Sequence, residues 1–286
     1  MIGQGTSLRR FWRCAWLGIF CLPVLLCAQS VFLGIDSTNT FYRLDPASAS
    51  ATIVGNAGLG FEVVEGLAIS PFGMVFGTGS SGNLYSFDPA TGAATFVGST
   101  GRGSIEALEF VGNSLVAFSA SSPSTFFSID MTSGATTDLF TSSFLLGGSP
   151  SPGVPRAMAA LDATTMFVML SGPAPNFYSV NLSTGAATLV GSMPGMSSVL
   201  AMDFHSDGLL YGFDSNGSVW RINFVTAATT FVGNTGGQSW RDATALAIPE
   251  PSTWALLVVG AGLVVARARQ SRRHAYRVFL ASLRRA

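Results

Sequence analysis

One phrase of about 42 residues recurs along the middle of the chain, and it constrains the fold more than any other feature. It opens with a short strand candidate ending in Phe/Leu-Tyr-x-apolar-Asp, passes through a turn of the form x-x-Thr/Ser-Gly, and closes on Ala-x-Thr-x-Val-Gly. Five copies are recognisable, and they centre on Asp45, Asp88, Asp130, Asn181 and Asn223. The spacings between these centres are 43, 42, 51 and 42 residues. A period near 42 with several short strands per repeat predicts the blades of a β-propeller.

Each repeat offers four strand candidates. In the second repeat they cover residues 65–70, 74–79, 83–88 and 94–99, which are rich in β-branched and aromatic residues and separated by Gly, Pro, Ser or Asn. The first of the four is apolar on both faces around Leu67, which suits an innermost strand beside a central channel. Its counterparts in the other repeats are expected at residues 108–110, 158–161, 200–204 and 246–248.

The two ends of the repeat region complement each other. The region opens at residues 31–36 with the second type of strand, and it closes at residues 245–248 with the first type. A C-terminal strand that completes the N-terminal blade would close the ring and remove its open sheet edges. The sequence therefore predicts an all-β propeller of five four-stranded blades over residues 31–248.

The Asp-Pro-x-Thr-Gly phrase, clearest from Asp88 to Gly92, has a structural interpretation. The Asp side chain can accept hydrogen bonds from backbone N–H groups two residues on, Pro fixes φ, and Gly takes positive φ before the return strand. A ring of metal ligands is the alternative, but the five Asp/Asn residues lie on separate hairpins, so we favour turns. By the same reasoning, residues 214–217 form a hairpin turn.

The repeats resemble a family of bacterial propeller-type domains of unknown function, which carry L-Y-x-[IF]-D-P-x-T-G followed by V-G. The resemblance covers most of residues 31–248. It implies the propeller fold and brings no catalytic residues with it.

The N-terminus has the pattern of a secretory signal peptide over residues 1–28. Arg9, Arg10 and Arg13 form the charged region, an apolar helical run covers residues 16–26, and Ala28 supplies a small residue before the expected cut. Twin-arginine export and a lipoprotein are alternatives that the neighbouring residues fit less well. The chain has only three cysteines, at positions 14, 21 and 27, so cleavage would leave a mature protein without thiols or disulfides.

The C-terminus has three parts in a fixed order. Pro249, Glu250 and Pro251 come first, and an uncharged stretch follows over residues 254–266, beginning at Trp254. An arginine cluster then begins, with Arg267, Arg269, Arg272 and Arg273. The apolar stretch can form a short membrane helix, and the arginines would hold its far end in the cytoplasm. A buried helix ending the domain is the alternative, which the arginines disfavour.

This order of residues resembles the PEP-CTERM sorting signal of Gram-negative bacteria over residues 249–273. The resemblance implies export, transient anchoring in the inner membrane, recognition by an exosortase-like enzyme, and release to the cell surface or the extracellular space. Such proteins tend to come from species that make extracellular polysaccharide. The chain departs from the family by a basic extension at residues 274–286.

Charge is unevenly distributed along the chain. The 15 basic residues, all arginine, balance the 15 acidic ones, yet residues 29–250 hold five of the arginines and all of the acids, a net of 5 − 15 = −10. An acidic middle without lysine argues against nucleic-acid binding. The 48% of hydrophobic residues argues against disorder.

Candidate chemistry is sparse. The middle has one histidine, His205, and no nucleophile elbow, phosphate loop or zinc spacing, so we predict no catalytic residue, metal ligand or cofactor. Five carboxylates lie on or beside innermost strands: Glu62, Glu65, Glu106, Glu109 and Asp162. Charges that keep the domain soluble are the favoured interpretation. The alternatives are a glycosidase pair and a Ca²⁺ site, for the carboxylates, and a metal site at His205.

The third interval is nine residues longer than the usual 42, and residues 140–156 occupy the place of this extra length. It leads into an innermost strand, so it should lie at one mouth of the ring, and it carries Phe144. Together with Glu65, Glu106 and His205, Phe144 makes up the expected ligand face.

Three functions are compatible with these features. The first is a non-enzymatic binding module for polysaccharide or matrix components. The second is a hydrolase acting on a glycoside or a lactone through mouth carboxylates, and the third is a structural protein of the matrix.

Overall fold

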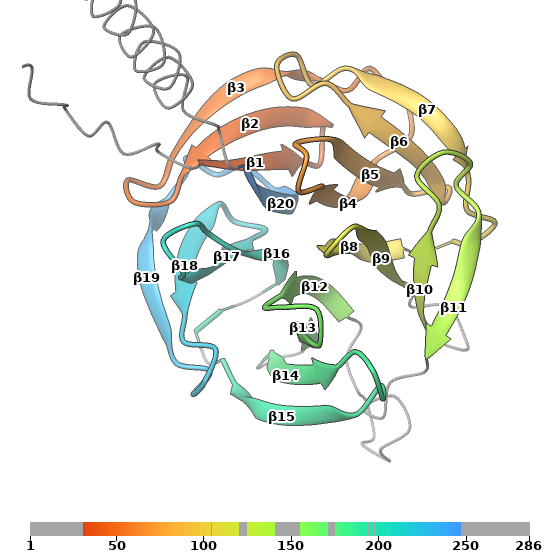
Figure 1. Ribbon diagram of the computed structural model, residues 1–286. Helices are drawn as coiled ribbons and strands as arrows, with labels where there is room; N and C mark the ends of the chain where they lie inside the picture. Colours follow the sequence, from red (N-terminus) through yellow and green to blue (C-terminus); the bar gives the residue numbers. More distant parts are fainter. Residues whose placement is uncertain are drawn as a thin grey trace, which may run out of the picture.

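The computed structural model describes residues 31–103, 105–119, 125–140, 155–170, 175–193, 195–196 and 198–246. These residues form twenty strands in five antiparallel four-stranded sheets arranged around one axis (Figure 1). The sequence-predicted fold, five blades of four strands, is confirmed. The predicted signal peptide, the predicted sorting tail with its apolar stretch, the basic extension and most of the insertion lie outside the described residues.

Strands are numbered along the chain and blades by their order in the ring. The innermost strands are β20 (Trp240–Leu246), β4 (Val64–Ile69), β8 (Ile105–Val111), β12 (Pro155–Ala160) and β16 (Val199–Phe204), in blades 1 to 5. The second strands are β1 (Val31–Asp36), β5 (Val75–Gly79), β9 (Ser114–Ser119), β13 (Thr165–Leu170) and β17 (Leu210–Asp214).

The third strands are β2 (Thr40–Asp45), β6 (Asn83–Phe87), β10 (Thr125–Ile129), β14 (Asn176–Asn181) and β18 (Ser218–Ile222). The outermost strands are β3 (Ser50–Asn56), β7 (Ala94–Ser99), β11 (Thr136–Phe140), β15 (Ala187–Ser192) and β19 (Thr229–Asn234). The second-repeat candidates agree with β4 to β7 to within one residue at each end.

The core is divided among the joints between blades. The second strands are buried on both faces, whereas the outermost strands alternate between half-buried and exposed residues. Five apolar clusters result, each built from two adjacent blades; one of them joins Leu33 and Phe41 of blade 1 to Val64 and Leu67 of blade 2. Burial of these side chains is the main force that holds neighbouring blades together.

The ring closes through its last strand, as predicted. Strand β20 pairs antiparallel with β1, and Val31 lies opposite Leu246. Trp240 is fully buried in this strand, and its ring packs edge-on against Tyr42 at 5.2 Å. The expected start of the strand, residue 245, was wrong, because β20 begins five residues earlier; residues 247 and 248 lie outside the described residues. Arg241 and Asp242 interrupt the apolar pattern and made this stretch look like a loop.

The turns of the repeated phrase are also confirmed, with Ala49 and Ala227 taking positive φ at the position that is Gly in the other three. In all five, the side chain at the first position accepts a hydrogen bond from the backbone N–H two residues on, for example Ala90 N–H to Asp88 Oδ1 at 2.8 Å. The hairpin after β17 follows the same rule, with Asp214 accepting from the N–H groups of Asn216 and Ser218.

The Val-Gly step of the repeat has a packing role that the sequence did not reveal. A Cβ atom built on Gly55 would lie 1.9 Å from the carbonyl oxygen of Thr91, in the turn of the next blade. Across the closing joint, a Cβ atom on Gly233 would lie 2.8 Å from Cβ of Ala49. Glycine at this step thus leaves room for the turn of the neighbouring blade. The Val-Gly end of one repeat therefore packs against the turn of the next repeat.

Candidate functional site

The two faces of the ring differ because all five innermost strands run in the same direction. We call the face where these strands begin the entry face, and the face where they end the exit face. The turns from the first to the second strand and from the third to the fourth strand lie on the exit face. The chain passes from one blade to the next on the entry face.

Every innermost strand carries a β-bulge near its start. The pairing with the second strand skips one residue in each blade, for example between Val64 and Gly66 in β4. The skipped residues are equivalent around the axis, and we call them the entry ring: Glu65, Glu106, Arg156, Leu200 and Arg241. Bulges of this kind re-aim a side chain, and here they place four charged groups at one mouth.

The charges of the entry ring balance, but they are not all paired. An ion pair joins Arg156 Nη1 to Glu106 Oε2. Burial, followed by the nearby charge of Glu106, raises the pKa of Glu65, while Arg241 and Arg156 act in the opposite direction. Nε of Arg241 is buried and has no hydrogen-bond partner among the described residues. Among the described residues the ring therefore holds one ion pair, Glu106 with Arg156, and beside it Glu65 and Arg241, whose charges interact.

Two other predicted carboxylates have structural tasks. Glu62 accepts hydrogen bonds from the hydroxyl groups of Ser81 and Tyr85. Burial by itself would raise the pKa of Glu62, but these bonds outweigh it and lower the pKa. Asp162 lies in the turn after β12 and accepts from the N–H groups of Thr164 and Thr165, at 2.7 and 2.9 Å.

Three acidic side chains lie deeper, among the innermost strands. Oδ2 of Asp242 accepts from the Leu67 N–H at 2.7 Å, and Oδ2 of Asp203 accepts from the Ala245 N–H at 2.7 Å. Each bond reaches the innermost strand of the next blade, whose axis-facing N–H groups have no strand partner. Glu109 is buried and accepts from the Phe110 N–H at 2.7 Å.

The buried position of these groups controls their protonation. Burial raises the pKa of Asp203 to about 6, and it raises the pKa values of Glu109 and Asp242 well above the ordinary range. The expectation that innermost strands are apolar on both faces was therefore incomplete. The sequence analysis noted Glu109 but missed the roles of Asp203 and Asp242. A single acidic residue inside an otherwise apolar strand pattern was the feature that could have identified them.

At the exit face, Glu109, Asp203 and Thr244 line a cavity of about 280 Å³ together with the turn after β4. No group of three or more His, Cys, Asp or Glu side chains among the described residues is arranged to hold a metal ion.

The structure divides the expected ligand face. Glu65 and Glu106 are neighbours in the entry ring, whereas His205 follows β16 at the exit face. The His205 ring stacks on Phe32 at 5.4 Å, and its Nδ1 lies 3.1 Å from Asp207 Oδ1. His205 thus lies away from the two glutamates, at the other end of the innermost strands. Phe144 lies outside the described residues.

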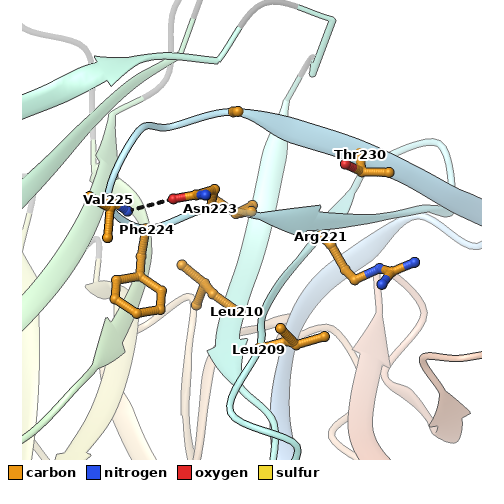
Figure 2. Close-up of a pocket in the computed structure, with 9 residues that line it drawn as sticks. Leu209, Leu210, Arg221, Asn223, Phe224, Val225 and Thr230 are labelled. Atoms are coloured by element: carbon orange, nitrogen blue, oxygen red, sulfur yellow. Dashed lines mark hydrogen bonds between the residues drawn. The ribbon is translucent and has the colours of Figure 1, made fainter.

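A second hollow lies on blade 5 at the exit face, and Figure 2 shows its lining. Its volume is about 500 Å³, and Leu209, Leu210, Phe224 and Val225 give it an apolar wall on which Arg221 supplies the one positive charge. The turn is held by the bond from Val225 N–H to Asn223 Oδ1 at 2.9 Å, drawn as a dashed line. Phe224 and Val225 stand where blade 2 has Pro89 and Ala90, so the apolar wall of this hollow comes from side chains that the equivalent turn of blade 2 lacks.

Helices long and apolar enough to cross a membrane are absent from the part of the chain that the structure describes. The predicted apolar stretch, residues 254–266, lies outside that part.

Comparisons with known proteins bear on the tail and on the fold. Residues 247–273 match the model of the PEP-CTERM protein-sorting motif. This motif implies an exported protein that crosses the membrane and is processed by an exosortase-type system. None of the curated proteins compared with the chain matches it.

Among solved structures, a chain in the crystal structure of a nidogen/laminin complex is similar over 76% of this chain and 98% of that one, with 13% identity and a TM-score of 0.56. BamB from Moraxella catarrhalis is 23% identical over 71% of this chain and 58% of its own, with a TM-score of 0.35. At these identities the first likeness supports the propeller fold and nothing further.

Proposed function

We propose that the chain is a surface-displayed propeller that binds an extracellular polysaccharide at the entry ring. In this proposal the apolar stretch at 254–266 anchors the exported chain in the inner membrane until an exosortase-like enzyme releases it. The observation that carries the binding site is the set of five aligned bulges, which turns two carboxylates and two guanidinium groups toward one mouth.

The chemistry of the ring suits a neutral polyhydroxylated ligand. Sugar hydroxyl groups donate to carboxylates and accept from guanidinium groups, and Glu65 and Arg241 offer both beside each other. Balanced charge in the ring favours a neutral polymer over a strongly anionic one. The long connection between blades 3 and 4 starts after Phe140 and ends at Pro155, so both of its ends lie on the entry face, where the entry ring is.

A glycan array probed with the full chain, purified in mild detergent, tests the proposal. We expect binding to at least one polysaccharide, including the polymer that the producing organism secretes. No binding to any polysaccharide would contradict the proposal and favour a purely structural role in the matrix.

Hydrolysis is a second candidate, favoured by one observation. Glu65, whose pKa is raised, adjoins Glu106, which is paired with Arg156. A pair of neighbouring carboxyl groups, one of them with a raised pKa, is the arrangement that glycosidases use. Turnover of a glycoside or lactone that disappears in Glu65→Gln, with an unchanged melting temperature, would establish it. No turnover across a broad substrate panel would exclude it.

A further inference from the structure

Both described ends of the chain lie on the exit face. Leu246 ends the innermost strand β20, and Val31 lies opposite it at the start of β1. Leu246 also lines the exit-face cavity together with Pro71 and Gly73 of the turn after β4. The sorting tail, which begins directly after this strand, therefore leaves the propeller from the exit face.

The connection to the apolar stretch is short. Residues 247–253 separate Leu246 from Trp254, and even fully extended these seven residues reach no further than about 25 Å. While the stretch is held in the membrane, the exit face is thus confined close to the lipid surface. This step rests on the anchoring that is part of the proposed function.

Large exposed apolar side chains occur on this face in the two blades that flank the exit point in blade 1. In blade 2, Phe72 and Met74 are 76% and 48% exposed, and in blade 5, Leu209 and Val225 are 41% and 72% exposed. We call these four residues the exit patch. Leu209 and Val225 also border the hollow that contains Arg221 (Figure 2).

We propose that the exit patch rests on the lipid surface of the membrane while the chain is anchored, so that the entry ring faces away from the membrane. Exposed Phe, Leu, Met and Val side chains gain free energy at the boundary between headgroups and acyl chains. The apolar hollow with Arg221 fits a phospholipid, whose phosphate would approach the guanidinium group. Polymer binding and processing of the tail would then take place on opposite faces, and binding need not wait for release.

Charge on the exit face indicates which lipid it fits. Asp45, Asp88 and Asp207 lie in turns of the same three blades and are engaged by N–H or hydroxyl groups of their own turns. Their negative charges outnumber the nearby arginines, Arg43 and Arg221. The exit face should therefore bind a zwitterionic lipid surface more strongly than a strongly anionic one. Added salt should reduce this difference in binding.

Depth-dependent fluorescence quenching tests the orientation. The full chain, with Cys14, Cys21 and Cys27 replaced by Ser, carries one new cysteine for a fluorophore: Phe72→Cys on the exit face, or Phe61→Cys as control. Phe61 is fully exposed in the loop before β4 and so lies on the entry face. The two faces are separated by the length of an innermost strand, about 20 Å at 3.3 Å per residue.

The labelled chains are reconstituted into phosphatidylcholine vesicles with a nitroxide on the lipid headgroup, and flotation first measures anchoring. We expect the Phe72→Cys label to be quenched at least about threefold more than the Phe61→Cys label, because short-range quenchers reach only groups at the interface. Equal quenching, or stronger quenching at position 61, would overturn the inference. A chain that does not float would overturn both the inference and the proposed anchoring.

A patch variant provides an independent measurement. Phe72→Ser, Leu209→Ser and Val225→Ser together change exposed side chains only, so the fold should persist, and a Met74→Cys label reports the contact. We expect its quenching to fall to the level of the Phe61→Cys control, and unchanged quenching would contradict the role of the patch. Polymer binding is measured separately. An oriented chain that binds no polymer refutes only the proposed ligand, and a polymer-binding chain without orientation refutes only this inference.

Discussion

Gly98 lies directly beneath the carbonyl oxygen of Ser133, and a Cβ atom at this glycine would stand 1.9 Å from that oxygen. Gly98 belongs to the outermost strand of blade 2, and Ser133 belongs to the turn of blade 3. Gly191 in blade 4 approaches the turn of blade 5 less closely, and a Cβ atom there would lie 3.0 Å from Cβ of Ala227. The repeated phrase therefore determines how neighbouring blades pack against each other as well as how each blade folds.

The first prediction concerns this joint. Gly98→Ala should lower the free energy of unfolding by about 1–3 kcal/mol, because an overpacked contact with backbone forces the two blades apart. Urea denaturation followed by tryptophan fluorescence measures it. Gly103→Ala is the matched control, since a Cβ atom at that position would meet no other atom within 4 Å, and it should leave stability nearly unchanged. Equal effects of the two substitutions would show that the close approach carries no packing energy.

The second prediction concerns ring closure. Trp240→Ala should lower the free energy of unfolding by about 3–5 kcal/mol, because it empties a fully buried site in the strand that completes blade 1. It also removes the bond from Trp240 Nε1 to Thr235 Oγ1, 3.1 Å long. Trp220→Ala, at a half-buried tryptophan in the third strand of blade 5, should be less harmful. A smaller loss at position 240 than at 220 would argue that the closing strand is not critical.

The third prediction concerns pH. The pKa of Asp203 is raised to about 6 by burial in the folded state, against an ordinary value of 3.8. Below about pH 4 this carboxyl is protonated in both the folded and the unfolded state, so it does not lower the free energy of unfolding. As the pH rises from 4 to 6, the unfolded state loses its proton first, so stability falls by on the order of 3 kcal/mol. Glu109 and Asp242, whose pKa values are also raised by burial, should extend the fall to higher pH.

Urea titrations at pH 5 and pH 8 measure this effect. We expect greater stability at pH 5, and Glu109→Gln should reduce the difference because it removes one of the interacting carboxyls. Turn aspartates do not obscure the comparison. Hydrogen bonds from Thr132 lower the pKa of Asp130 to about 2, so its contribution is lost only below the chosen range. Equal stability at the two pH values, or lower stability at pH 5, would contradict the account of the buried acids.

The fold was predictable from the sequence because its determinants are local and repeated. Turn chemistry at Asp88 and its equivalents and the strand pattern are each visible within a few residues. The repeat region begins with a second strand and ends with an innermost strand. Pairing these two strands completes blade 1 and closes the ring. The start of β20 was missed because Arg241 and Asp242 look like loop residues, and their role depends on a bulge and on the neighbouring strand β4.

The candidate site was predictable only in part. Glu65 and Glu106 were recognised as mouth residues, and Arg156 only as the end of a segment expected at a mouth. Arg241 was not recognised, because equivalence around the axis depends on the five bulges. His205 was wrongly grouped with the glutamates. Glu65 and Glu106 lie at the starts of innermost strands and His205 directly follows one, so the order of residues along the chain already places them on opposite faces.

Binding of the purified full chain to the polysaccharide that it binds best on the glycan array tests the central claim most directly. Arg241→Met removes one of the two guanidinium groups of the entry ring, the one beside Glu65, and it should weaken binding at least about tenfold. Arg43→Met, at an exposed arginine outside the entry ring, is the matched control and should bind like the unchanged chain. Undiminished binding by Arg241→Met, or an equal loss in both variants, would contradict the assignment of the entry ring as the binding site.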